Sequence, residues 1–94
     1  MNKERLHEKL TEMFPNYKFE IATVYDPFTF SPIVGIRISG THGCIRYNPD
    51  VIQNEFVKCG ESAEKLFFDS VCDGILTYIN NGEYPSKLIN FTCE

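Results

Sequence analysis

The thiol of Cys44 has His42 and Arg46 two positions away on either side. On a β-strand, residues at i and i+2 share one face roughly 6.5–7 Å apart, and a cation at that distance lowers the pKa of a thiol. The spacing therefore permits a cysteine-dependent enzyme. However, His42 falls in a predicted turn, and no Asp or Asn is placed to orient it as a base. We expect no catalytic residues in this chain.

The four cysteines, Cys44, Cys59, Cys72 and Cys93, include no Cys-x-x-Cys pair of the kind that forms a compact zinc site. We therefore predict no metal site and no cofactor. The N-terminus is charged and lacks a signal-peptide core, so we expect a cytoplasmic protein with reduced, mostly buried thiols.

A second group of polar side chains, Asp69, Asp73 and Thr77, recurs at every fourth position. On a helix these residues lie on one face, where the two carboxylates repel each other by a few tenths of a kcal/mol. A cationic protein partner would relieve that repulsion, so we predict a protein-binding surface here. The alternative is an ordinary solvated helix face.

Two aromatic residues, Phe28 and Phe30, lie in a turn-rich segment between Pro27 and Pro32. Such segments lie on the surface, and exposed aromatics on a restrained loop are natural anchors for a protein partner. These two residues complete the predicted protein-binding set. The alternative is that both rings fold back and seal the core.

Three cations, Lys18, Arg37 and Arg46, are predicted to point outward from one sheet face because side chains alternate along a strand. Arginine suits bidentate recognition of phosphate or carboxylate, so this face is the alternative site, for nucleic acid or another anionic ligand. The competing interpretation is a solvated face with cross-strand Glu–Arg pairs.

The elements that must position these residues follow from periodicity and from turn residues. Residues 3–14 repeat apolar positions at helical spacing, whereas residues 17–25, 33–39 and 44–47 alternate as strands do. In the first strand, Tyr17, Thr23 and Tyr25 are predicted to face the core. A Gly-rich connection over residues 40–43 joins the second and third strands.

Two further helices are predicted in the second half of the chain. Asn48 followed by Pro49 starts the first, Gly60 ends it, and Ser62 is predicted to cap the second, which stops at Gly82. Residues 88–94 alternate and are predicted to add an edge strand. The order α-β-β-β-α-α, with this possible C-terminal strand, predicts an α+β two-layer sandwich: an antiparallel sheet of three to four strands with helices on one face.

Length and charge narrow the function classes. Ninety-four residues predict a single domain over residues 1–94, and a net charge of −4 makes nucleic acid an unlikely partner. No run reaches the ~18–20 apolar residues of a membrane span, so no membrane association is expected. We expect a monomer or a homodimer that binds a larger protein of unknown identity.

The order of the elements is similar to that of some small acidic phage proteins that block host nucleases by imitating DNA. That resemblance implies an anti-defence inhibitor. The order as far as the second helix also resembles that of double-stranded-RNA-binding domains. Those domains need basic residues at the start of the closing helix, but in this chain that region contains Asp50, Glu61 and Glu64. The leading hypothesis is a small non-enzymatic regulator or inhibitor.

Overall fold

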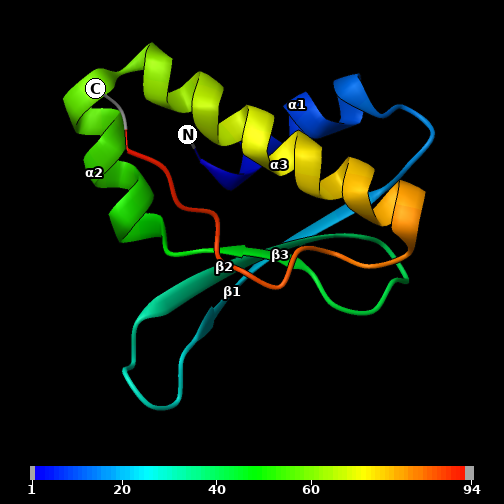
Figure 1. Cartoon of the computed structure of the whole chain (residues 1–94), viewed down its shortest axis with the longest axis horizontal. Coiled ribbons are helices and arrows are strands. Elements are labelled where there is room, and N and C mark those ends of the chain that lie inside the picture. The colour runs from blue at the N-terminus through cyan, green and yellow to red at the C-terminus, as the bar shows by residue number, and fades with distance from the viewer. Residues whose placement is uncertain (1, 93–94) are drawn as a thin grey trace.

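The computed structural model describes residues 2–92, which form one antiparallel sheet and three helices. The elements are α1 (Lys3–Met13), β1 (Phe19–Tyr25), β2 (Pro32–Ile38), β3 (Ile45–Tyr47), α2 (Pro49–Cys59) and α3 (Glu61–Asn81). The strand order is β1-β2-β3, and the helices lie on one side of the sheet (Figure 1). The predicted α+β order α-β-β-β-α-α is confirmed.

The β1–β2 hairpin is the longest pairing in the sheet. Its register runs from Phe19 opposite Ile38 to Tyr25 opposite Pro32. The third strand is much shorter, and it pairs with β2 only from Val34 opposite Tyr47 to Ile36 opposite Ile45. The half of the hairpin that ends at Tyr25 therefore projects away from the helices (Figure 1).

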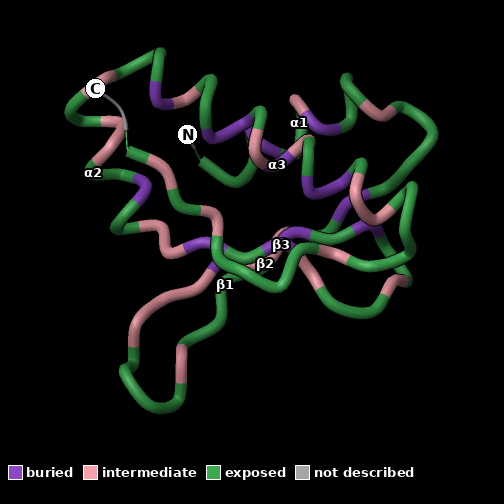
Figure 2. The backbone as a smooth tube through the Cα atoms, viewed as in Figure 1, coloured by how far each residue is buried: buried purple, intermediate pink, exposed green. Residues whose placement is uncertain are grey.

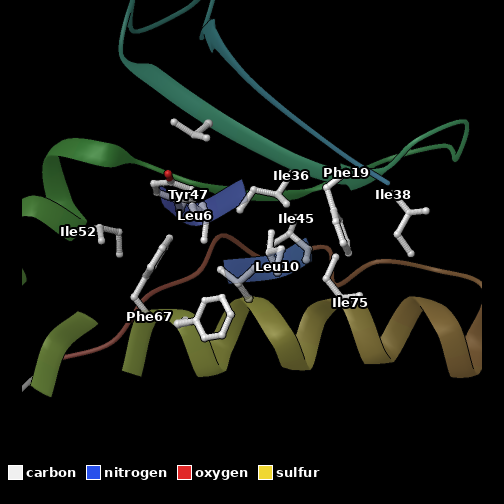
Figure 3. Close-up of a cluster of buried hydrophobic side chains, with 13 residues drawn as sticks. Leu6, Leu10, Phe19, Ile36, Ile38, Ile45, Tyr47, Ile52, Phe67 and Ile75 are labelled. Carbon is white, nitrogen blue, oxygen red and sulfur yellow. The ribbon is translucent and has the colours of Figure 1, made fainter. Parts of the chain in front are cut away.

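The core forms where the apolar positions of the strands meet the apolar stripes of the helices. Ile36 and Ile45 point from the sheet towards α3, which contributes Phe67 and Ile75 (Figure 3). Tyr47 packs edge-on against Phe67, with their ring centroids 4.8 Å apart. The buried cluster also includes Leu6, Leu10, Phe19, Val34, Ile38, Ile52, Phe68 and Val71.

Three inward assignments on the first strand are wrong. Tyr17, Thr23 and Tyr25 are exposed, and Tyr25 keeps 69% of its surface accessible. Alternation places Thr23 and Tyr25 on the helix side of the sheet, but the helices bury neither residue, and α1 reaches Thr23 only through the exposed side chain of Lys3. Figure 2 shows the buried stretches confined to the half of the sheet beneath the helices.

The ends of the helices follow capping chemistry in most cases. The side chain of Asn48 accepts hydrogen bonds from the backbone N–H groups of Asp50 and Val51, and Gly82 ends α3 in the left-handed conformation with φ of 78°. The predicted cap at Ser62 is wrong. Gly60 takes the N-cap position of α3, and it makes no side-chain hydrogen bond there.

The predicted C-terminal strand is not present in the part of the chain that the structure describes. Residues 88–92 form no strand, although the N–H of Ile89 donates a hydrogen bond of 2.9 Å to the carbonyl of Arg46 in β3. The last two residues of that prediction, Cys93 and Glu94, lie outside the described residues. One backbone bond therefore partly covers this edge of the sheet.

Side-chain chemistry extends the sheet beyond the short third strand. The hydroxyl of Tyr84 accepts a hydrogen bond of 2.8 Å from the backbone N–H of Ile38 and lies 2.8 Å from Oγ1 of Thr41. Its ring stacks on Tyr78 of α3, with centroids 4.4 Å apart. Tyr84 thus takes the place that a longer β3 would occupy, and it joins the C-terminal segment to both layers.

Candidate functional site

The turn that joins β1 and β2, residues 26–31, is held by hydrogen bonds to Asp26. We name this turn the hairpin tip. The backbone N–H of Asp26 donates to the carbonyl of Ser31 at 2.9 Å, and the N–H of Phe30 donates to the carbonyl of Asp26 at 2.8 Å. The Asp26 carboxylate also accepts hydrogen bonds from the N–H groups of Phe28 and Thr29. These bonds hold the turn in one conformation.

The hairpin tip presents two aromatic rings to solvent. Phe28 is 91% exposed and Phe30 is 79% exposed, so neither ring folds back on the core. Phe30 also has a positive φ of 57°, a left-handed conformation that costs a residue with a side chain about 1 kcal/mol or more. Val24 and Tyr25 next to the tip are exposed too. Exposed apolar side chains are therefore frequent from the end of β1 to Phe30.

The predicted protein-binding surface on α3, formed by Asp69, Asp73 and Thr77, makes some of its contacts within the chain itself. Asp69 and Asp73 are exposed, but Thr77 is half-buried and its hydroxyl donates to the carbonyl of Asp73 at 2.8 Å. Burial raises the pKa of the neighbouring Cys72 thiol, and with the added effect of the Asp69 and Asp73 charges that pKa reaches about 11. Lys9 of α1 lowers the same pKa, which places a cation near this thiol.

The chain's own C-terminal segment lies beside this part of α3. A hollow of about 300 Å³ separates them, and its lining includes Asp73, Thr77 and Lys87. Gly74 of α3 is buried, because the side chain of Ile45 packs directly on it. The close approach that a mid-helix glycine permits is therefore made by β3.

On the outer sheet face, which points away from the helices, two of the three predicted cations have partners within the chain. Arg37 forms an ion pair with Glu20, with Nε 2.6 Å from Oε2, and it donates to the carbonyl of Thr41. Arg46 donates to the carbonyl of Ser86 at 2.6 Å. Lys18 is exposed. The face thus contains the cross-strand Glu–Arg pair expected of a solvated sheet surface.

The Cys44 thiol lies on this same outer face and is half-buried. It borders a hollow of about 650 Å³, whose lining also includes His42, Arg46 and Glu83. His42 is exposed in the connection between β2 and β3, and within residues 2–92 no hydrogen bond joins it to the thiol.

Cysteine chemistry differs from the prediction at one position. Cys44 and Cys72 are free thiols, but Cys59 is disulfide-bonded, so the expectation of reduced thiols is wrong there. Over the described range, no three His, Cys, Asp or Glu side chains come together as a metal ion would need.

Sequence reasoning missed the exposure of Tyr25, which lies next to the tip and adds to its exposed apolar surface. The signal that would have shown it is a difference in strand length. A first strand ending at Tyr25 is far longer than the third strand, so the helices and β3 can shelter only part of the hairpin.

Comparison with family models, with curated proteins and with solved structures found no match to this chain. Among the helices within residues 2–92, none has both the length and the apolar content needed to cross a bilayer.

Proposed function

We propose that this chain is a small non-enzymatic interaction protein, a regulator or inhibitor that docks on a larger protein through its hairpin tip. One observation carries the proposal: Phe28 and Phe30 are both exposed on a turn that hydrogen bonds hold in place. Small domains normally bury aromatic rings, and exposed apolar patches on an ordered surface mark binding sites.

The energetics of the tip support a role as an anchor. Burying an aromatic ring removes roughly 150–250 Å² from water, which is worth on the order of 4 kcal/mol before the entropy cost of association. The fastened turn lowers that cost because the rings are already positioned before binding. A partner with a shallow apolar pocket for each ring fits this geometry.

The charge of the molecule adds to the choice of partner. The net charge is −4, and Asp69 and Asp73 are exposed on α3. Opposite charge on a partner speeds encounter and selects against wrong partners more than it adds affinity. We therefore propose that the tip supplies affinity and that the acidic surface steers the chain to a basic protein.

The test is a paired capture experiment with the double variant Phe28→Ala/Phe30→Ala. Both rings are exposed, so the variant should keep the melting temperature of the parent chain while it loses the protein that the tagged parent recovers from a lysate. Met13→Ala/Val57→Ala is the matched control, because these apolar side chains are exposed elsewhere. It should recover the same protein as the parent.

Two results would contradict this function. One is a recovered protein that binds both double variants equally well. The other is recovery of nucleic acid that Lys18→Glu abolishes, because that would assign binding to the outer sheet face. Asp69→Lys/Asp73→Lys should weaken capture mainly at low salt, where charge steering is strongest.

A further inference from the structure

The first strand forms one edge of the sheet, and its outer backbone groups are open. Hydrogen bonds from Ser39 to Lys18 and from Asp26 to Ser31 fix the pairing pattern at both ends of the β1–β2 ladder. In an antiparallel pair, bonded positions alternate, so the even-numbered residues of β1 bond to β2 and the odd-numbered residues face the edge. Ile21, Thr23 and Tyr25 therefore direct their N–H and C=O groups outward.

No strand of the described chain pairs with this edge, which α1 contacts through Lys3 and His7. Between positions 2 and 92, no backbone hydrogen bond reaches the outward groups of Ile21, Thr23 or Tyr25. Proteins usually protect an edge strand with a lysine, a proline or a bulge, but residues 21–25 read Ile-Ala-Thr-Val-Tyr. The opposite edge, by contrast, receives the N–H of Ile89.

We propose that a second copy of this chain pairs with the β1 edge, strand against antiparallel strand, around a two-fold axis at Thr23. That register places Thr23 opposite Thr23 of the second copy, Ile21 opposite Tyr25, and Ala22 opposite Val24. Thr–Thr and aromatic–β-branched pairs are among the favourable cross-strand neighbours. Each side chain thus meets a suitable partner, and the two sheets become one.

Both ends of this register agree with the chemistry of the chain. The next bonded position would set Phe19 opposite Pro27, which has no N–H to donate. The carbonyl of Phe19 does not need that donor, because Nε2 of His7 lies 3.2 Å from it. The ladder therefore stops at Ile21 and Tyr25, and the carbonyl of Phe19 keeps His7 as its partner.

The surface beside this edge carries charges of both signs. A hollow of about 350 Å³ lies next to Ile21, lined also by Lys3, Glu4, His7 and Glu8 of α1. Lys3 donates to the hydroxyl of Thr23 at 2.8 Å, so it would lie near the axis. The acids on the same helix supply opposite charge across it.

The first experiment measures mass in solution by sedimentation equilibrium, over a range of concentrations. The measured mass of the parent chain should rise to twice 10.8 kDa. Thr23→Pro should weaken the dimer about thirtyfold, because each copy loses one outward N–H donor and β2 loses none. Thr23→Val is the matched control. It removes the hydroxyl that Lys3 binds but keeps the N–H, so it should remain a dimer.

The second experiment needs no variant and tests the register itself. Amide hydrogen exchange on the parent chain should show slow exchange at positions 20, 22 and 24 from pairing with β2, and equally slow exchange at 21, 23 and 25 from the second copy. A mass of 10.8 kDa at every concentration, or protection at even positions alone, would overturn the proposal.

The proposed dimer and the proposed function can be contradicted independently of each other. The Phe28→Ala/Phe30→Ala variant leaves residues 21–25 intact, so it should remain dimeric even when it loses its protein partner. Thr23→Pro should keep the exposed tip. If Phe28→Ala/Phe30→Ala alone produced monomers, the second copy would be bound through the tip and the edge pairing would be wrong.

Discussion

At the scale of single residues, the Tyr84 hydroxyl joins three parts of the molecule. It accepts the N–H of Ile38, which lies just past the end of the β2–β3 ladder, and it contacts Thr41. A strand N–H that lies partly buried without a partner costs free energy, so this one hydroxyl stabilises the end of the sheet. Because Tyr84 lies far from Ile38 in the sequence, no local sequence pattern predicts this role.

Removing the Tyr84 hydroxyl tests that role. Tyr84→Phe keeps the stacking on Tyr78 but leaves the N–H of Ile38 without its acceptor, so we expect the free energy of unfolding to fall by about 1–2 kcal/mol. Denaturant unfolding measures this change. Tyr17→Phe, at an exposed ring, is the control and should change stability little. Equal effects of both changes would argue against a structural hydroxyl.

At the scale of elements, the contact of α3 with the sheet depends on a missing side chain. A Cβ built on Gly74 would lie 2.7 Å from Cδ1 and 2.9 Å from Cγ1 of Ile45. Both distances are shorter than carbon atoms tolerate, so the buried side chain of Ile45 would have to shift to admit a methyl group. Glycine therefore fixes how closely α3 lies against β3.

Gly74→Ala should consequently destabilise the protein although alanine is the better helix former. Overpacking costs about 1–3 kcal/mol, against about 1 kcal/mol gained from helix propensity. We expect a net loss of about 1 kcal/mol in thermal or denaturant unfolding. The smaller side chain in Gly74→Ala/Ile45→Val should recover part of that loss. A stabilised Gly74→Ala variant would show that the interface yields easily.

Element identity was predictable because local rules decide it. The stripe through Phe67, Val71 and Ile75, the Asn48 cap and the stop at Gly82 each need only neighbouring residues. The failures depend on distant contacts. Tyr25 alternates correctly but has no helix above it, and residues 88–92 alternate correctly but make only one backbone bond to β3.

The candidate site was predictable in part for the same reason. Turn residues around Phe28 and Phe30 indicated a surface loop, but the alternation pattern could not decide whether the rings faced solvent or the core. That depended on how far the helices extend over the hairpin. The open edge at Thr23 was also hidden, since a sequence pattern marks strands but not which of them is left without a neighbour.

At the scale of the whole molecule, folding and proton binding are coupled at high pH. Burial raises the pKa of Cys72 from 9.0 to about 11, with Asp69 and Asp73 acting in the same direction, and burial raises the pKa of Tyr47 from 10.0 to about 12. Both groups ionise more easily in the unfolded chain. Their contribution is therefore complete below pH 9 and is lost as the pH rises towards 12.

We expect the free energy of unfolding to decline between about pH 9 and pH 12. Urea unfolding at a series of pH values measures the decline, and Tyr47→Phe should flatten it above pH 10 because the buried phenol with the raised pKa is removed. The slope is the readout, so a change in stability at neutral pH does not interfere. An unaltered slope in this variant would assign the alkaline loss to other groups.

The projecting hairpin divides the molecule into a part that must be kept and a part that is free to vary. The core depends on Phe19, Ile36 and Ile45, and none of these side chains is shared with the tip at Phe28 and Phe30. Under the proposed function, substitutions at Phe28 and Phe30 would change what the protein recognises at little cost to folding. Under selection, this turn can diversify rapidly on an unchanged scaffold, as recognition loops do on other rigid frameworks.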